Sequence, residues 1–470
     1  MGLEFLNDRV KTELSYLAFG GTDWTHPLEH PDGHVYDAVI VGAGQSGLGA
    51  AFGLLRERIS NILVIDENPE GFEGPWDTYA RMITLRTPKH LTSIDLGIPS
   101  LTYRSWWEAQ AGAQAWEEVD KIPRREWMNY LRWYRRVLGL PVINEVKLNL
   151  IEPAGDGLKR LHITGQGAPS DQLLARKVIL ATGIQGGGEW HVPPFIANKL
   201  PKRLYAHTSE SIDFTALAGK RIGILGGGAS AFDNANHALA EGVSEAHLFV
   251  RREKLPSINP IRQMEVSGII ERFHALEDAD KYSVISHFFK HNQPPTNDTF
   301  ARAAAWPGFQ LHLGAPWLDV AGAGDQAAVT TPQGVFHFDY LIISTGLLSD
   351  PGLRPELSLV EQHIARWSDR YQPPAETANA LLDAHPYLSP GFAFISRDEE
   401  GRQPLHGLFV FNYSALASCG LSASAISGIK YAIPKLTAAV ADQLFMDDRA
   451  AILNRFYSYN QAEFTGEWPL

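Results

Sequence analysis

The sequence predicts an α/β fold that contains two Rossmann-like units, each a buried strand, a glycine-rich turn and a helix of small residues. Two stretches predict these units, DAVIVGAGQSGLGAAFGLL at residues 37–55 and RIGILGGGASAFDNANHALA at residues 221–240. The third observation is size, because 470 residues exceed what one compact core usually holds. Two or three domains are therefore expected.

The first unit begins with an apolar, β-branched strand over residues 36–41. Gly42, Gly44 and Gly47 follow as GxGxxG, with Gln45 and Ser46 between them. Such a turn needs its first glycine for a tight bend, its second for backbone approach to a pyrophosphate, and its third for close packing of helix on strand. The start of the following helix then offers free N–H groups to an anion.

A second strand, NILVIDENPE, ends in Asp66 and Glu67. A carboxylate at this position accepts hydrogen bonds from ribose hydroxyls, and Asp66 is favoured over Glu67. The alternative is a glycine-rich turn followed by solvated acids. The sequence thus favours a dinucleotide such as FAD at the first unit.

The second unit carries Gly226, Gly228 and Ala231 as GxGxxA, with Ala229 and Ser230 opening its helix. Its next strand, EAHLFVRREK, ends in Arg251 and Arg252, where the first unit has acids. Guanidinium groups pair with a 2′-phosphate, which a carboxylate would repel. This predicts NADPH in preference to NADH, the alternative being a solvated basic strand end.

Two more apolar strands stop at a Thr-Gly pair, RKVILATG at Thr182 and Gly183 and FDYLIISTG at Thr345 and Gly346. With these motifs in this order, and with EGPW ending at Trp76, the chain resembles the class B flavin-dependent monooxygenases. That group includes flavin-containing monooxygenases, amine N-hydroxylases and Baeyer–Villiger enzymes. The resemblance implies an NADPH domain inserted into an FAD domain.

The resemblance divides the chain into four parts. They are an N-terminal helix and arm at 1–35, the first part of the FAD domain at 36–200, the NADPH domain at 201–340, and the second part of the FAD domain with a C-terminal tail at 341–470. Val146 and Ser422 are included among the expected cofactor contacts, Ser422 because Ser418 to Ser422 is similar to a flavin-lining element of amine N-hydroxylases.

The resemblance also implies the chemistry. Reduced FAD would react with O₂ to form a C4a-(hydro)peroxyflavin that oxygenates a small substrate, most plausibly at nitrogen or sulfur. Baeyer–Villiger oxidation of a ketone is one alternative. An NADPH-linked reductase or oxidase without oxygen transfer is the other. Cys419 is the only cysteine, which excludes a dithiol route.

Three residues are candidates for catalysis. Arg86 and Lys89 lie in RMITLRTPKHL, a region near the flavin in dimethylaniline-type monooxygenases. If the resemblance holds there, Arg86 could hydrogen-bond the peroxyflavin or a substrate carboxylate. The alternative is an arginine paired with a surface carboxylate. His207 lies in KRLYAHTSESIDF, which partly matches the linker fingerprint of class B enzymes. A linker histidine that caps a turn and one that couples domain movement to NADP binding are both compatible with this match.

Composition limits the partners. A net charge of −12 opposes binding to nucleic acid, and the single cysteine suits the reducing cytoplasm. No membrane association is expected, because the long uncharged run at 38–55 contains five glycines. His26, Glu29 and His30 spell HxxEH, but the neighbouring prolines oppose the helix that this zinc pattern needs, so no metal is expected. A homo-oligomer is left open.

Overall fold

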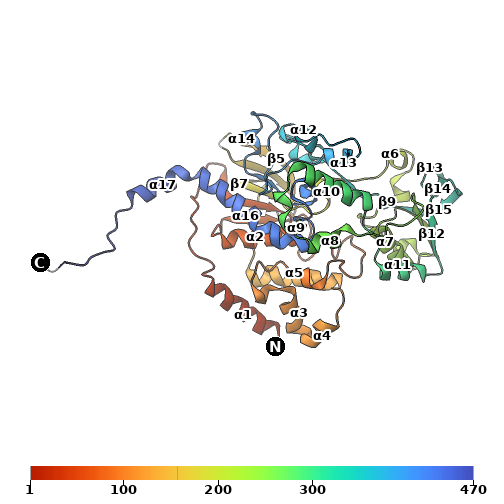
Figure 1. Ribbon diagram of the computed structural model, residues 1–470, viewed down its shortest axis with the longest axis horizontal. Coiled ribbons are helices and arrows are strands. Elements are labelled where there is room, and N and C mark those ends of the chain that lie inside the picture. Colours follow the sequence, from red (N-terminus) through yellow and green to blue (C-terminus); the bar gives the residue numbers. More distant parts are fainter. Residues whose placement is uncertain (1, 156, 469–470) are drawn as a thin grey trace.

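The computed structural model describes residues 2–155 and 157–468, which form two α/β lobes (Figure 1). The first lobe is built on an eight-stranded sheet of order β4-β3-β2-β7-β6-β5, in which β1 also pairs with β2 and β18 with β7. Its strands are β1 (Glu29–His30), β2 (Gly33–Val41), β3 (Ile62–Ile65), β4 (Val142–Ile143), β5 (Lys147–Pro153), β6 (Lys159–Thr164), β7 (Gln172–Leu180) and β18 (Leu408–Val410).

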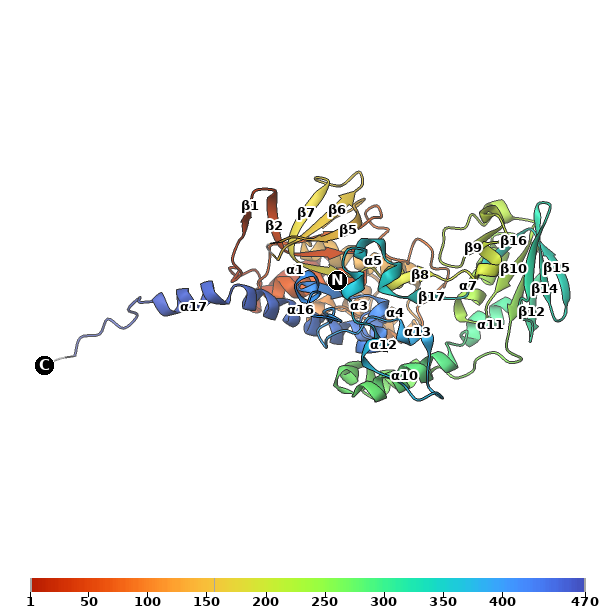
Figure 2. The same ribbon diagram turned by 90° about the horizontal axis from the view of Figure 1, so that it is seen from above.

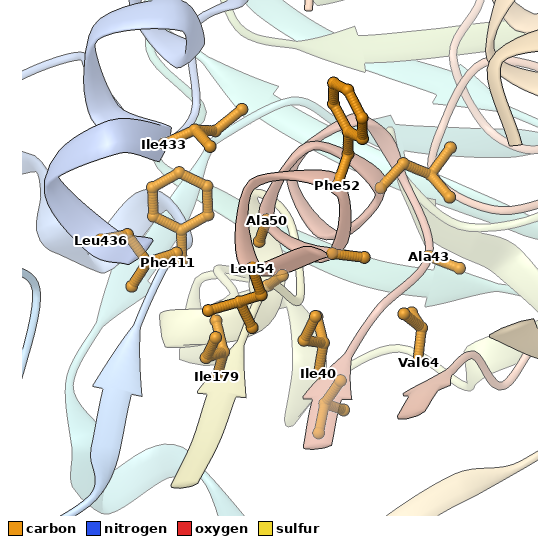
Figure 3. Packing of buried hydrophobic residues seen from close by; sticks show 14 of the residues in the cluster. Ile40, Ala43, Ala50, Phe52, Leu54, Val64, Ile179, Phe411, Ile433 and Leu436 are labelled. Atoms are coloured by element: carbon orange, nitrogen blue, oxygen red, sulfur yellow. The ribbon is translucent and has the colours of Figure 1, made fainter. Parts of the chain in front are cut away.

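The parallel part of this sheet explains why its strands read as continuous apolar runs. Strand β2 lies between β3 and β7, with Ile40 level with Val64 on one side and with Ile179 on the other. Helices cover the sheet, so these side chains are buried on both faces. The close view in Figure 3 shows the helix that follows β2 lying over this layer.

The helices of the first lobe come from distant parts of the sequence. They are α1 (Leu3–Tyr16), α2 (Gln45–Arg56), α3 (Tyr103–Ala111), α4 (Ala113–Glu118), α5 (Arg124–Leu138), α12 (Trp367–Arg370), α13 (Ala380–Asp383), α14 (Arg402–Leu405), α15 (Leu416–Cys419), α16 (Ile426–Asp447) and α17 (Arg449–Ser458). Helix α16 packs on α2, where a Cβ at Gly49 would lie 2.3 Å from Ile433 and one at Gly53 would lie 2.7 Å from Thr437. The small residues of α2 therefore allow α16 to approach closely.

The second lobe contains a five-stranded parallel sheet of order β12-β11-β10-β16-β9 and a three-stranded antiparallel sheet. The strands are β9 (Tyr205–His207), β10 (Arg221–Leu225), β11 (Glu245–Val250), β12 (Phe309–Leu313), β13 (Asp319–Ala323), β14 (Gln326–Thr331), β15 (Gly334–Phe338) and β16 (Tyr340–Ile343). Its helices are α6 (Pro194–Ala197), α7 (Ala229–Ala240) and α11 (Asn297–Ala304). Figure 2 shows this lobe set apart from the first at one end of the molecule.

Two boundaries differ from the sequence prediction. Strand β16 pairs with β10 and β9, so the second lobe continues past residue 340, to at least Ile343. The segment with helices α8 (Pro260–Val266), α9 (Ile269–Arg272) and α10 (Asp278–His291) packs on α12 and α15 of the first lobe. The first difference arises from strand pairing and the second from helix packing, and both involve residues far apart in sequence.

Two of the chain segments that cross between the lobes pair with each other. Strand β8 (Gly188–Trp190) precedes the second lobe, and β17 (Leu347–Ser349) follows it. They form an antiparallel two-stranded sheet in which Leu348 is level with Glu189. A Cβ at Gly188 would lie 1.7 Å from the Leu348 carbonyl oxygen, so glycine is required for this contact.

The N-terminal segment contains helix α1 and then an extended stretch in which β1 pairs with the start of β2. Helix α1 buries Leu6, Val10 and Leu14 against the first lobe. In the part of the chain that the structure describes, no helix combines the length and the apolar character needed to cross a bilayer.

Candidate functional site

The first glycine loop lies where the carboxyl ends of β2 and β7 meet. Gly42 has a φ of +103°, and a Cβ there would lie 2.5 Å from the Ala181 carbonyl oxygen. A Cβ at Gly47 would lie 1.8 Å from the Gly42 carbonyl oxygen. Both contacts are with backbone atoms, so only glycine fits either position.

Beside this loop the backbones of Gly44 and Gly74 lie next to each other. A Cβ at Gly44 would lie 3.8 Å from the Gly74 Cα, and no other atom comes within 4 Å of it. The Trp76 indole lies against Gly74, and its buried Nε1–H has no hydrogen-bond partner within the described residues. Backbone lining and an unpaired buried donor are what a dinucleotide needs to approach closely, so the residues fit FAD.

The predicted ribose ligand Asp66 is already engaged within the protein. Its Oδ2 accepts a hydrogen bond of 2.7 Å from the Ala43 N–H, and its Oδ1 accepts from the backbone and side-chain nitrogens of Asn68 at 2.8 and 3.0 Å. Asp66 therefore holds the glycine loop onto β3. Glu67 is exposed at the adjacent position.

The other predicted residues around this loop have structural contacts. The Gln45 Oε1 accepts from the Trp127 indole at 3.1 Å, and the Ser46 hydroxyl donates to the Ala423 carbonyl at 3.1 Å. Val146 is buried, and its N–H donates to the Asp66 carbonyl at 2.8 Å. The Ser422 hydroxyl donates to the Cys419 carbonyl at 2.8 Å. The loop is thus tied to α5 and to the segment before α16.

A cleft of about 240 Å³ opens next to this loop. Its walls include Ala43, Gly71 and three arginines of α5, which are Arg132, Arg135 and Arg136. Arg132 pairs with Asp77 at 2.8 Å and Arg135 with Glu73 at 2.7 Å, while Arg136 is exposed. Glu70 and Glu73 also line the cleft, so its wall carries charges of both signs.

The second glycine loop is more open. A Cβ at Gly226 would lie 2.5 Å from the Ser344 carbonyl oxygen, whereas nothing lies within 4 Å of one at Gly228. Helix α7 begins directly after this loop, with Ala229 buried and Ser230 exposed.

The two predicted arginines follow β11. Arg251 is exposed, and Arg252 donates to the Lys290 carbonyl at 3.2 Å. The open loop, the exposed start of α7 and this basic strand end fit a phosphorylated dinucleotide.

The two Thr-Gly pairs lie at the ends of β7 and β16. Thr182 accepts a hydrogen bond of 3.1 Å from the Asn412 side chain, and Gly183 is exposed. The Thr345 hydroxyl donates to the His191 carbonyl, and the Gly346 carbonyl accepts from the His191 N–H at 3.0 Å. The first pair therefore contacts the strand-to-helix segment after β18, and the second contacts the crossing between the lobes.

Arg86 reaches from the first lobe to the second. It forms an ion pair with Asp233 of α7, whose side chain is 8% exposed. The Arg86 carbonyl also accepts a hydrogen bond of 2.8 Å from Arg262 of α8. Burial raises the pKa of Asp233, and the nearby Arg86 opposes this rise. This buried ion pair fixes the helix of the second glycine loop against the first lobe.

Lys89 points in another direction. Its ammonium donates to the Trp116 carbonyl at 2.6 Å and lies 4.8 Å from the centre of the Trp116 ring. It therefore packs against α4.

His207 is buried at the end of β9. Its ring stacks on Trp190 with centroids 5.0 Å apart, and its Nδ1 accepts a hydrogen bond of 3.2 Å from the Ser209 N–H. Burial lowers the pKa of His207 to about 4. The imidazole is therefore neutral at pH 7.

Sequence reasoning missed Asp233, Asn234 and Arg81. Arg81 donates to the Thr208 carbonyl at 3.1 Å and the Glu210 carbonyl at 3.0 Å, and the Asn234 amide donates to the Thr208 hydroxyl. The only sequence signal was a pair of polar residues within the small-residue helix ASAFDNANHALA.

Among the described residues, no three His, Cys, Asp or Glu side chains gather where they could hold a metal ion.

Comparisons with known proteins agree with this arrangement. A family model described as FAD-NAD(P)-binding matches residues 39–185, and one described as L-lysine 6-monooxygenase/L-ornithine 5-monooxygenase matches residues 115–299. The FAD-dependent urate hydroxylase of Xanthomonas campestris pv. campestris is 61% identical over 470 residues, which cover 100% of this chain and 98% of the relative.

Two solved structures share the fold. The ornithine hydroxylase of Pseudomonas aeruginosa is 16% identical with a TM-score of 0.68, covering 87% of this chain and 100% of its own. The ornithine N-hydroxylase of Kutzneria sp. 744 is 15% identical with a TM-score of 0.67, and the match covers 87% of this chain and 99% of that one. The predicted α/β fold with two Rossmann-like domains is confirmed.

The depressed pKa of His207 predicts a pH-dependent stability. An unfolded histidine binds a proton near pH 6.5, but folded His207 does so only near pH 4. Its contribution is therefore fully present above about pH 6.5 and is lost as the pH falls toward 4. Between pH 7 and pH 5, a His207→Gln variant should lose about 2 kcal/mol less unfolding free energy than the parent protein. Urea denaturation at both pH values measures this, with His337→Gln at an exposed position as control. Equal losses in parent and variant would contradict it.

Proposed function

We propose that this chain, which belongs to the family of flavin monooxygenases that includes the FAD-dependent urate hydroxylase of Xanthomonas campestris, hydroxylates urate with NADPH and O₂. The observation that carries the proposal is 61% identity along the whole of both chains. At such identity over the full length, the residues that line a substrate pocket are also expected to be largely shared.

Membership of this family confirms three sequence predictions. The protein is an enzyme, it is an FAD-dependent monooxygenase, and it binds FAD and NADP(H). The resemblance to class B flavin monooxygenases is also confirmed. The peroxyflavin intermediate and the cytoplasmic location stay predictions.

The proposed reaction converts urate, NADPH, a proton and O₂ into hydroxylated urate, NADP⁺ and water. Bound FAD supplies the electron transfer from NADPH to O₂ and the transfer of one oxygen atom. Urate is an electron-rich purine that is anionic at neutral pH, so it suits attack by an electrophilic oxygen. The protein's contribution is to bind and orient urate and the cofactors and to exclude water.

In the proposal, the first glycine loop with Asp66 and Trp76 holds FAD, and the second loop with Arg251 and Arg252 holds NADPH. The ion pair between Arg86 and Asp233 positions NADPH relative to FAD, because it joins α7 to the first lobe. Arg86 is then a positioning residue, and the sequence-based roles of Lys89 and His207 in catalysis stay predictions.

The match to the lysine and ornithine monooxygenase model over residues 115–299 favours a second candidate. In this case the enzyme oxygenates the nitrogen of a small amine. This agrees with the sequence-based prediction that a small substrate is oxygenated at nitrogen or sulfur. An electron-rich amine or thioether takes up the oxygen atom without a strong enzymic base. A ketone would test the Baeyer–Villiger alternative.

The first test is substrate-dependent turnover. Urate should stimulate NADPH oxidation and O₂ consumption by the purified FAD-loaded enzyme, with parallel loss of the ultraviolet absorption of urate. An amine, a thioether and a cyclic ketone serve as competing substrates, and xanthine is the matched purine control. Stimulation by the amine or thioether alone would replace the proposal with the second candidate.

The second test concerns the 2′-phosphate. An Arg251→Ala variant should raise the KM for NADPH by at least tenfold and leave the KM for NADH within about twofold, because only NADPH carries the phosphate. Arg251→Lys keeps the charge and should recover part of the loss. Equal effects on the two nucleotides would refute the assignment of Arg251.

The third test concerns Arg86 and Asp233. Replacing Asp233 with Asn removes a buried charge partner, so flavin reduction by NADPH should slow by about tenfold while FAD content is unchanged. Asp298→Asn is the matched control, because Asp298 pairs with Lys121 at 2.6 Å across the same lobes but is 42% exposed. It should change the rate by less than twofold. The positioning role fails if both variants reduce flavin at the parent rate.

A further inference from the structure

The C-terminal segment at 449–468, which we call the C-terminal arm, extends away from both lobes. Figures 1 and 2, which view the molecule from directions 90° apart, both show α17 and the following chain projecting beyond the body. No residue of α17 is buried, and residues 454–468 are all exposed. The arm therefore lacks the packing that ordinarily stabilises a segment of this length.

The arm is rich in large apolar side chains despite its exposure. The exposed aromatic residues are Phe456 at 71%, Tyr457 at 74%, Tyr459 at 59%, Phe464 at 86% and Trp468 at 88%. The Phe456 and Tyr457 rings lie 5.6 Å apart, and the other three residues follow along the chain. So much exposed apolar surface ordinarily marks an interaction site. The arm is thus expected to be covered.

Within α17 the apolar residues share one side. Ile452 and Phe456 are four residues apart, as are Leu453 and Tyr457, so they form one stripe along the helix. Helix α17 continues from α16 through Asp448, whose N–H donates to the Leu444 carbonyl and whose carbonyl accepts from the Ile452 N–H, both at 3.0 Å. The backbone of α17 is thus supported by α16, but Phe456 and Tyr457 of its apolar stripe are exposed.

The start of the arm is held rigidly. Asp448 immediately precedes α17 and is 8% exposed. Its carboxylate accepts hydrogen bonds from buried Arg176 at 2.8 and 3.0 Å and from the His26 N–H at 3.1 Å. Arg176 also pairs with buried Asp37 of β2 at 3.1 Å. This network anchors the residue from which α17 begins to the first lobe.

An exposed apolar surface adjoins the point where the arm begins. We call it the root patch, and it consists of Leu28 at 42%, Phe445 at 42% and Met446 at 54% exposure. Its parts are close together, because the Trp24 and Phe445 rings lie 6.3 Å apart and the His26 N–H bonds to Asp448. Two unpartnered apolar surfaces thus meet at one end of the molecule.

We propose that the C-terminal arm docks on a second copy of this chain. The arm and the root patch are contiguous, so a two-fold axis near the root lets each arm cover the other chain's root patch. Residues 449–468 with the root patch are comparable to the about 20–30 residues a side of a stable interface. Two copies that each carry a net charge of −12 repel each other, so their contact must be apolar. The C-terminal arm and the root patch both provide apolar surface.

The same features argue against a membrane as the occupant. The arm carries Glu463 and Glu467, and its only basic residues are Arg449 and Arg455. Surface helices that bind anionic lipid have a polar face rich in lysine and arginine.

Sedimentation of the FAD-loaded protein tests the proposal. The parent chain should sediment as a dimer at micromolar concentration, and truncation after Asp448 should give a monomer. Phe456→Glu and Met446→Glu, one on the arm and one on the root patch, should each raise the dimer Kd by at least tenfold. Tyr16→Glu, at an exposed aromatic position 81% accessible on α1, is the matched control and should leave the Kd unchanged. A monomeric parent chain, or a dimer that survives the truncation, would overturn the proposal.

A spin label on the arm gives an independent readout. Cys419 is buried, and burial raises the pKa of its thiol to about 12, so a Ser458→Cys variant can be labelled selectively. Pulsed dipolar spectroscopy should show a distance between two labels that disappears on dilution with excess unlabelled chain. The absence of such a distance would mean that the arm does not contact a second copy. Neither readout depends on the substrate or on turnover, so failure here leaves the proposed function untouched.

Discussion

The contact between backbone atoms at the first glycine loop is the constraint on which the rest of the first lobe depends. Gly42 lies against the Ala181 carbonyl, and Gly47 lies against the Gly42 carbonyl. These contacts bring the ends of β2 and β7 to one edge of the sheet and set the position of α2. The glycines of α2 then allow α16 to return from the end of the chain and close the core. The first glycine loop and the tightly packed core thus depend on one run of small residues.

Local features of the sequence were sufficient to predict the fold class and the two cofactors. The roles of Gly42 and Gly226 follow from their positions directly after apolar strands, so no knowledge of distant residues was needed. The choice of FAD and NADP(H) followed from charge, since acids end the second strand of one unit and arginines end that of the other. The fold class and the two cofactors are confirmed, and both were predictable because strand, turn and helix are adjacent in sequence. The assignment of each cofactor to its loop stays a proposal.

Other features depend on residues that lie far apart in the chain, and the sequence alone does not pair them. The ion pair between Arg86 and Asp233 joins positions 147 residues apart. The placement of β16 in the second sheet depends on hydrogen bonds to β9 and β10. Asp66 was predicted to face ribose, but the structure shows its carboxylate holding Ala43 and Asn68, a contact that the ribose pattern does not anticipate.

The paired crossing strands β8 and β17 have a mechanical consequence. Strand β8 leads into the second lobe and β17 leads out of it, and a hydrogen-bonded ribbon with Gly188 packed on Leu348 ties the two together. A shift of one strand along the other would break these hydrogen bonds, so the ribbon restrains the entry and the exit of the second lobe to move as one unit.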